Sequence, residues 1–208
     1  MVDAQNHIQD VPVTVRSIRR STGIVGLNLL LNGGFPDGTI IMVYGTPVAG
    51  VDLAAHQFWK GDRSEDGTYL MNDGDVDAEM IDATDMHPDL YLTQMAGKRI
   101  VIDSLSIPIV KYGIDVVLKF LSNARDEMRK RNANMVFVVY TNIHPPIEMT
   151  RIMRAADIVI EFKTMIHQGE VERIIEVQKI KNTAVPQRLL PFNITDNGIE
   201  ASTTSRVV

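Results

Sequence analysis

Three apolar runs rich in strand-forming residues constrain the fold more than any other feature of this sequence. Residues 39–44, 99–103 and 135–140 lack the alternation of polar and apolar positions that marks a strand with one face in water. They therefore predict strands; those at 39–44 and 135–140 are buried on both faces, and the one at 99–103 ends in an acid. Segments of helical periodicity follow in the chain, at residues 51–60, 112–131 and 149–155. Buried strands that alternate with helices predict a parallel sheet covered by helices on both sides.

The last part of the chain has a different pattern. Residues 158–165 and 172–181 predict two strands that form an antiparallel hairpin around Gln168-Gly169. Residues 189–195 predict another strand, which precedes a turn at 196–198. The predicted fold class is therefore α/β: a three-layer α/β/α sandwich, with a mostly parallel sheet and antiparallel strands at its C-terminal edge.

The same pattern predicts the domain organisation. We expect a single domain over residues 17–201, because no linker, repeat or low-complexity stretch interrupts the sequence there. An N-terminal extension over residues 1–16 precedes the domain, and a polar tail over residues 202–208, which we expect to be flexible, follows it. Near the start of the domain, Ser21-Thr22 predicts the N-cap of a helix that ends at Gly33-Gly34.

Composition excludes several classes of function. The 208 residues include 26 acidic and 21 basic side chains, and the resulting formal charge of −5 disfavours binding to nucleic acid or to an anionic membrane. The absence of cysteine excludes disulfides, thiolate metal sites and a cysteine nucleophile. No apolar run approaches the roughly 18 residues of a membrane span, and the first residues do not resemble a signal peptide. We therefore expect a cytoplasmic protein that does not enter a membrane.

The loop after the first buried strand is the most informative segment for function. It consists of Gly45, Thr46, Pro47, Val48, Ala49 and Gly50, and the predicted helix then opens with Val51 and Asp52. A strand, a loop between two glycines and a helix form the context of the phosphate-binding motif G-x-x-x-x-G-K-[ST]. Here Val51 stands at the lysine position and Asp52 at the Ser/Thr position. From the glycines alone, a coincidental strand–turn–helix is an open alternative.

These two residues change the electrostatics of such a loop. In the motif, backbone N–H groups and the helix N-terminus attract phosphates, the lysine neutralises charge and the hydroxyl ligates Mg²⁺. Only the backbone contribution can remain with Val51 and Asp52 in place. A misplaced charge ~4 Å from a phosphate costs about 4 kcal/mol at an effective dielectric constant of about 20. Tight binding of Mg·ATP in the usual mode is therefore not expected.

Motifs spread along the chain resemble the KaiC-like branch of the RecA superfamily of P-loop ATPases. Residues 21–27 (STGIVGL) are similar to the motif that opens this family, and residues 100–105 (IVIDSL) resemble its Walker B strand. Residues 179–183 (KIKNT) and 191–199 (PFNITDNGI) resemble two motifs near its end. The resemblance covers most of the chain and implies a RecA-like ATPase core, with a nucleotide site between the subunits of a ring or filament.

The resemblance also implies roles for individual residues. Asp103 matches the Walker B aspartate, which supports the metal ion. Asp73 stands near the position of a glutamate that activates water. Lys179 and Lys181 lie in the segment whose basic residues reach the phosphate of a neighbouring subunit.

Departures from the family pattern concern the same machinery. Val51 and Asp52 replace the phosphate- and metal-binding pair, and Val48 stands where a glycine is common. The span from Tyr69 to Asp103 is short for the family, which indicates a trimmed helix–strand unit. We therefore predict a degenerate Walker A motif in a catalytically inactive protein without a cofactor.

Such a protein would act through contact with a protein partner or an active paralogue, as a homo- or hetero-oligomer. The alternative is a noncanonical ATPase of the same family that binds ATP with Mg in signal transduction, using Lys179 or Lys181 of a neighbouring subunit. A relative of DNA-binding recombinases is a third reading, which the net acidity disfavours.

Two further features of the sequence have simple explanations. Seven acidic residues and no Lys or Arg lie between positions 73 and 89. Their first part resembles the start of an EF-hand loop, but Ala78 and Thr84 occupy the positions that require glycine and glutamate, so a solvated acidic loop is favoured. After residues 135–140, Thr141, Asn142 or His144 stands where RecA-like folds carry a polar sensor, although a loop histidine before a turn is the favoured interpretation of His144.

Overall fold

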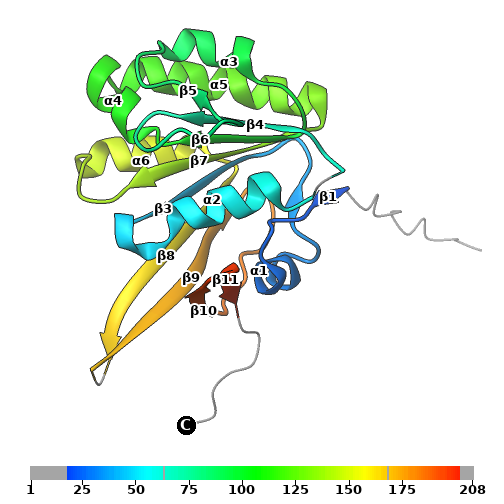
Figure 1. Cartoon of the computed structure of the whole chain (residues 1–208), viewed down its shortest axis with the longest axis vertical. Helices are drawn as coiled ribbons and strands as arrows, with labels where there is room; N and C mark the ends of the chain where they lie inside the picture. The colour runs from blue at the N-terminus through cyan, green and yellow to red at the C-terminus, as the bar shows by residue number, and fades with distance from the viewer. Residues whose placement is uncertain (1–17, 63, 168, 202–208) are drawn as a thin grey trace, which may run out of the picture.

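A computed structural model describes residues 18–62, 64–167 and 169–201 of the chain. Figure 1 shows a central sheet with helices on both of its faces. Among the described residues the sheet has nine strands, in the order β11-β10-β9-β8-β3-β7-β6-β4-β5. Its strands are β3 (Ile40–Gly45), β4 (Gly67–Met71), β5 (Ile81–Asp82), β6 (Arg99–Asp103), β7 (Asn134–Tyr140), β8 (Ile158–His167), β9 (Glu170–Ile180), β10 (Leu190–Thr195) and β11 (Gly198–Ala201).

The direction of the strands divides the sheet into two parts. Strands β5, β4, β6, β7, β3 and β8 are parallel, whereas β9, β10 and β11 continue the sheet in antiparallel pairs. A separate antiparallel pair is formed by β1 (Arg19–Arg20) and β2 (Phe35–Pro36). The predicted α/β class, with antiparallel strands at the C-terminal edge, is confirmed. The predicted extension over residues 1–16 and the tail over 202–208 lie outside the described residues.

The helices form the outer layers of the sandwich. They are α1 (Val25–Leu30), α2 (Val51–Lys60), α3 (Tyr91–Gln94), α4 (Ser106–Tyr112), α5 (Ile114–Arg131) and α6 (Pro146–Ala155), with short 3₁₀ turns η1 (Pro47–Ala49) and η2 (Pro88–Leu90). On β3, Ile41 and Val43 pack into the core under α1 and α2, and Met42 packs into the core under α4, α5 and α6. Because both faces of β3 are buried, its sequence shows no polar alternation.

The structure corrects several local predictions. The helix expected over residues 112–131 corresponds to α5, which begins at Ile114, while Tyr112 is the last residue of α4, a helix that was not predicted. Gly113, with a φ of 87°, separates the two helices. The N-cap prediction for Ser21-Thr22 is wrong, since α1 begins at Val25 and its N-cap residue, Ile24, makes no side-chain cap. The Thr22 hydroxyl instead accepts a hydrogen bond from the Ile24 N–H.

The segment between β4 and β6 is short. It contains the two-residue strand β5, which pairs with β4, and the four-residue helix α3. The acidic residues that follow β4 are therefore exposed at the rim of the sheet rather than covered by a long helix. Among the helices that the structure describes, none has the length and apolar character needed to cross a membrane.

Candidate functional site at the carboxyl ends of the parallel strands

Four parallel strands, β3, β4, β6 and β7, end at the same edge of the sheet, and their following loops bring the predicted site residues together (Figure 1). In open α/β sheets, ligands bind at this carboxyl edge because the loops there present side chains from several strands to one place. Gly45, Asp73 and Asp103 reach this edge from three different strands. The sequence-predicted loop and both predicted acids therefore lie in one region.

The loop after β3 is folded tightly. Residues Pro47–Ala49 form the 3₁₀ turn η1, in which the Ala49 N–H donates a 3.0 Å hydrogen bond to the Thr46 carbonyl. Gly50 has a φ of 81°, and a methyl group at its Cα would lie 3.1 Å from Cδ1 of Ile194. A side chain at position 50 would thus be strained as well as crowded. Val48 is 71% exposed at the tip of the loop.

Val51 and Asp52 open α2 in opposite environments. Val51 is fully buried in the core beneath α1 and α2, whereas Asp52 is exposed in the first turn of the helix. A negative charge in the first turn interacts favourably with the helix dipole, so Asp52 suits α2 as a helix residue. It also places its charge at the edge where β6 ends, since it contributes to the pKa shift of Asp103.

Asp103 is the buried acid of the site. Its side chain is at the end of β6, the residue is 3% exposed, and Oδ2 accepts a 2.6 Å hydrogen bond from the Tyr69 hydroxyl. Burial raises the pKa of Asp103 to about 6, and the charges of Asp52 and Asp73 also raise it, whereas hydrogen bonding by Tyr69 and Tyr140 lowers it. Burial and the Asp103 charge in turn raise the pKa values of both tyrosines.

Several buried polar atoms around Asp103 have unused hydrogen-bonding capacity. In the described part of the chain, no hydrogen-bond partner is found for Asp103 Oδ1, Asn72 Nδ2, Ser104 Oγ or Thr141 Oγ1. These residues follow or end the neighbouring strands β4, β6 and β7. Asn72 is held by the Tyr91 hydroxyl, which donates a 2.6 Å hydrogen bond to its Oδ1. The edge therefore presents an acceptor, a donor and two hydroxyls, and buried groups of this kind are normally paired.

Sequence reasoning did not find Tyr69, Asn72 and Ser104 as members of this site. Tyr69 and Asn72 lie in or after β4, and they meet Asp103 only because β4 and β6 are neighbours in the sheet. The order of the strands in the sheet brings these residues together, and the sequence motifs do not encode that order.

His144, considered as a sensor in the sequence, lies in a buried polar cluster of its own. Its side chain is 1% exposed, its Nε2 lies 3.1 Å from Ser106 Oγ, and its Nδ1 lies 3.5 Å from Glu148 Oε2. Burial lowers the pKa of His144, and Glu148 opposes this shift. Ser106 also accepts a hydrogen bond from the Tyr140 N–H and is fully buried, so its hydroxyl is not accessible as a nucleophile. The i,i+4 spacing of His144 and Glu148 was the sequence signal for this contact.

Lys179 and Lys181 lie toward the other edge of the sheet. Lys179 pairs with Val159 near the start of β8, and its Nζ donates hydrogen bonds to the carbonyls of Met153, Arg154 and Ala156 at the end of α6. Lys181 Nζ lies 3.6 Å from Asp157 Oδ1, at the amino end of the sheet. Within one chain, these lysines are therefore not brought to Asp103 or to the loop after β3.

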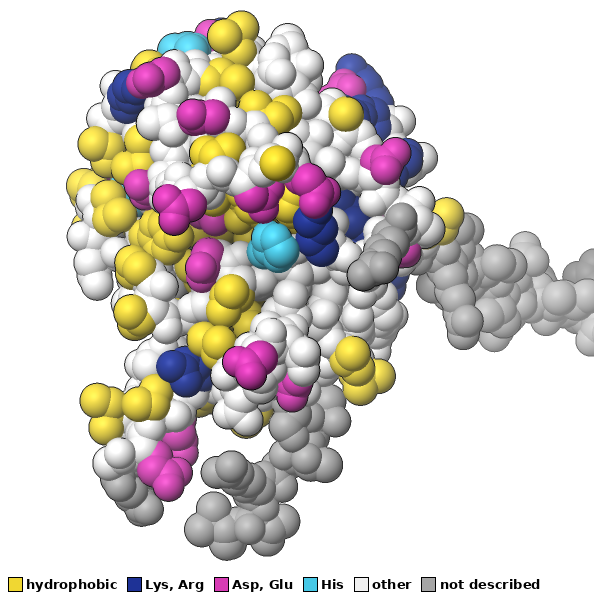
Figure 2. Space-filling view, in the orientation of Figure 1, with side chains coloured by type: hydrophobic (Ala, Val, Ile, Leu, Met, Phe, Trp, Pro, Cys, Tyr) yellow, Lys and Arg dark blue, Asp and Glu magenta, His cyan; other side chains and the backbone are white. Residues whose placement is uncertain are grey.

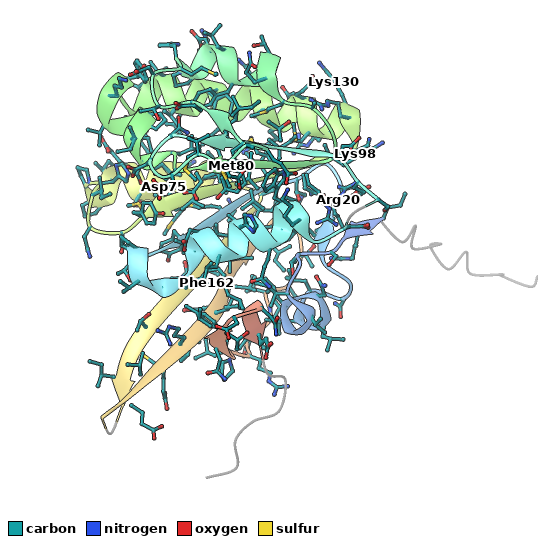
Figure 3. All side chains as sticks on the ribbon, in the orientation of Figure 1. Arg20, Asp75, Met80, Lys98, Lys130 and Phe162 are labelled. Carbon is teal, nitrogen blue, oxygen red and sulfur yellow. The ribbon has the colours of Figure 1, made fainter. Side chains whose placement is uncertain are left out.

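The acidic segment after β4 is exposed and locally hydrogen-bonded. Asp77 accepts a hydrogen bond from the Glu79 N–H, and Glu79 pairs with Lys60 at 2.6 Å. Figure 2 shows acidic side chains gathered over α2 and the segment after β4, and Figure 3 marks that segment by Asp75 and Met80. In the ranges that the structure describes, no group of three or more His, Asp and Glu side chains is arranged to hold a metal ion.

Comparison with known proteins agrees with the fold and the motifs. Residues 82–205 match the family described as ATPase: KaiC, and this match covers more than half of the chain. The fold is similar to the crystal structure of a KaiC-like protein from the hyperthermophilic archaeon Pyrococcus horikoshii, with 20% identity and a TM-score of 0.73. That similarity covers 89% of this chain and 99% of the archaeal chain. No curated protein sequence matches.

The matched residues include Asp103, Lys179 and Lys181, and they begin after the loop that follows β3. The match thus rests on the second half of the fold and on the motifs near its end, independently of the residues at positions 45–52. The chain therefore belongs to the KaiC-like ATPase family of the RecA superfamily.

Proposed function

We propose that this chain is a KaiC-family domain with a degenerate Walker A loop, which does not bind Mg·ATP in the family's usual mode and acts through contact with other protein chains. The observation that carries the proposal is the placement of Val51 and Asp52. The side chain at the lysine position is apolar and fully buried, and the next side chain adds a negative charge to an edge that already holds Asp103.

The backbone of the loop supports the same proposal. A phosphate-binding loop depends on several free N–H groups that point toward one anion. Pro47 has no N–H, and the N–H of Ala49 is used within the loop by the Thr46 carbonyl. The contribution of backbone N–H groups to phosphate binding, which is the only part of the motif compatible with Val51 and Asp52, is therefore also reduced in this loop.

The residues present do not fit the polyphosphate of the nucleotide that the family implies. Within the described ranges, no group of three or more His, Asp and Glu side chains is arranged to hold its metal ion. Asp52, Asp73 and Asp103 are acids at an edge where a polyphosphate would require cations. Among the groups that shift the pKa of Asp103 most, none is a lysine, arginine or histidine. A phosphate group placed beside Asp103 would meet repulsion that none of these groups offsets. We therefore derive no step of ATP hydrolysis for this chain.

Exposed apolar side chains at the same edge support a role in protein contact. Val48, Ile143 and Ile147 are 71%, 45% and 68% exposed, and they follow the neighbouring strands β3 and β7. Figure 2 shows hydrophobic side chains gathered along the left side of the molecule, where these strands end. Contiguous exposed apolar surface on a folded domain is typical of protein–protein contact.

Equilibrium unfolding with and without nucleotide tests the proposal. A ligand that binds only the folded state with a Kd near 5 µM would add about 4 kcal/mol to the free energy of unfolding at about 5 mM Mg·ATP. We expect a change below about 0.5 kcal/mol for this chain. The double variant Val51→Lys/Asp52→Thr serves as the comparison, because it restores both side chains of the motif and leaves the sequence of residues 45–50 unchanged.

The noncanonical ATPase is the alternative that this experiment addresses. The observation in its favour is that Asp103 keeps the Walker B position with Oδ1 unpartnered in the described residues. Release of phosphate from ATP by the purified protein, abolished by Asp103→Asn, would support this alternative and overturn the proposal of an inactive site.

A further inference from the structure

The ends of β4 and β6 bring two acids side by side. Met71 pairs with Asp103 in the sheet, and the Asn72 N–H donates a 2.6 Å hydrogen bond to the Asp103 carbonyl. The next residue, Asp73, is exposed. Burial raises the pKa of Asp103, and the charge of Asp73 raises it further. A buried carboxylate and an exposed one therefore lie near each other at this edge, although like charges repel.

The ends of β3 and β7 bring a third acid and a tyrosine to the same edge. The Thr141 N–H donates a 2.9 Å hydrogen bond to the Gly45 carbonyl. The loop that leads to Asp52 therefore begins beside Tyr140, the last residue of β7. Burial raises the pKa of Tyr140, and the charges of all three acids raise it further, as expected for neighbouring groups. We call these four residues the acidic cluster: Asp52, Asp73, Asp103 and Tyr140.

The chain supplies no cation to the acidic cluster. Two other acids of the segment after β4 do have partners, since Glu79 pairs with Lys60 at 2.6 Å and Asp85 pairs with Lys111 at 2.7 Å. Within the described residues, no ion pair includes a member of the cluster, and no cation is among the main causes of the pKa shifts there. One member also lies in the first turn of α2, where its charge offsets the positive end of the helix dipole. The cluster therefore keeps a negative potential.

The buried acid of the cluster has an unused acceptor. Asp103 is 3% exposed, and its Oδ2 accepts a 2.6 Å hydrogen bond from the Tyr69 hydroxyl. No partner is found for its Oδ1, or for the fully buried hydroxyl of Ser104, in the ranges that the structure describes. Buried polar atoms are normally paired, and an unpaired carboxylate oxygen is costly. A ligand with N–H donors and a positive charge would satisfy this oxygen.

The distribution of the charge favours an organic cation over a metal ion. Across the described ranges, no three His, Asp or Glu side chains are arranged to hold a metal ion, which needs oxygen ligands at about 2.0–2.6 Å. The negative charge instead extends from the buried Asp103 to the exposed Asp52 and Asp73. Two ammonium groups joined by a short alkyl chain match this arrangement, since each makes its own charge-assisted hydrogen bonds. Tyr140, which is partly exposed, offers an aromatic ring to an ammonium group.

We propose that the acidic cluster binds a linear alkyl diamine in its doubly protonated form. One ammonium group donates a hydrogen bond to Asp103 Oδ1, and the other lies between Asp52 and Asp73. The inference rests on the proposed function, because the diamine occupies the edge at which the family binds a nucleotide. The acids that repel a polyphosphate are the groups that attract this ligand.

Calorimetric titration of the full chain with putrescine, a linear diamine, tests this proposal. At about pH 8 the ligand is doubly protonated and the acids are ionised, because the pKa of Asp103 is about 6. We expect saturable binding with a Kd below about 1 mM at about 50 mM salt, weakened at least about 10-fold at about 500 mM salt. Butanediol, which has a similar length without charge, and tetramethylammonium, which has a charge without N–H donors, should each bind at least about 10-fold more weakly.

Variants of the acidic cluster locate the site. Asp52→Asn/Asp73→Asn removes two exposed charges and Asp103→Asn removes the buried one, and each should weaken putrescine binding at least about 10-fold. Asp75→Asn/Asp89→Asn removes two charges from exposed positions outside the cluster, and it should change the affinity less than about 2-fold. Because positions 52 and 73 are on the surface, their double variant tests the site even if Asp103→Asn does not fold.

Three results would each overturn the proposal: no saturable heat with putrescine, binding of butanediol or tetramethylammonium as tight as that of putrescine, or equal affinity in the cluster variants and the control. Displacement of putrescine by micromolar Mg²⁺ would also overturn it, because the acids would then hold a metal ion. Failure of the proposed function is distinguishable from these results, since it appears as stabilisation by Mg·ATP in the unfolding experiment, which contains no amine ligand.

Discussion

The Tyr69 hydroxyl donates a 2.6 Å hydrogen bond to Asp103 Oδ2, across the neighbouring strands β4 and β6. Both residues are buried, and the charges of Asp52 and Asp73 oppose ionisation of Asp103. The tyrosine therefore stabilises a carboxylate that the rest of the site destabilises. Because β4 lies beside β6, the order of the strands determines which group stabilises the charge of Asp103.

The stability of the chain should depend on pH through Asp103. Its pKa is raised from 3.8 to about 6 in the folded state, first by burial and then by Asp52 and Asp73. A raised pKa means that the folded state binds the proton more tightly, so this contribution is complete below pH 3.8 and is lost as the pH rises through about 6. We expect the free energy of unfolding to fall by about 3 kcal/mol over this range relative to Asp103→Asn. Urea denaturation across the range measures it, and parallel curves for the two proteins would contradict it.

Removal of the tyrosine hydroxyl should raise the pKa of Asp103 further. In Tyr69→Phe, Oδ2 loses its donor while remaining buried, and we expect the variant to lose about 1–3 kcal/mol of stability above pH 7. Carboxyl-carbon NMR across a pH titration reports the shift directly. Tyr91→Phe is the matched control, because the Tyr91 hydroxyl binds Asn72 instead. Equal effects of both variants on the Asp103 titration would contradict the assignment.

Neutralising a neighbouring acid should have the opposite effect. Asp52→Asn and Asp73→Asn each remove a charge that raises the pKa of Asp103, so each should move that pKa toward its ordinary value. Asp75→Asn removes an exposed charge from the same segment that is not among the main causes of the shift, and it should leave the titration nearly unchanged. The same NMR titration checks the three variants. An effect of Asp75→Asn as large as the others would contradict the assignment of the pKa shift to Asp52 and Asp73 in particular.

The sequence located the acids and the loop of this site, but not the groups that surround them. Residues 100–102 are apolar before the acid at position 103, and the strand predicted over residues 99–103 agrees with β6 in both bounds. The contact of Tyr69 with Asp103 depends on β4 lying beside β6, and residues 34 positions apart in the chain give no local signal of this. Helix α4 was missed because Pro108 lies within its seven residues, and proline ordinarily argues against a helix interior.

Lys179 shows that a motif can identify a residue in the sequence without identifying the role of that residue in this chain. The resemblance assigned it to a neighbour's phosphate, whereas in this chain its Nζ binds three carbonyls at the end of α6. A cation at a helix C-terminus satisfies carbonyls that have no partner within the helix. Its capping role depends on how the hairpin of β8 and β9 folds back on α6, which the local sequence does not reveal.

Replacement of this lysine should therefore affect stability. We expect Lys179→Met to lower the free energy of unfolding by about 1–3 kcal/mol, because the carbonyls of Met153, Arg154 and Ala156 lose a charged donor. Lys119→Met, at an exposed position on α5, should change it by less than about 0.5 kcal/mol. Urea denaturation of both variants measures the difference, and an unchanged stability of Lys179→Met would contradict the capping role.

Direct titration of Mg·ATP into the chain, followed by isothermal calorimetry, tests the central claim that the loop after β3 does not bind nucleotide in the usual mode. The buried Val51, the exposed Asp52 and the internal hydrogen bond of Ala49 predict no saturable heat up to about 1 mM ligand. A single-site isotherm with micromolar or tighter affinity, lost in Asp103→Asn, would contradict the claim.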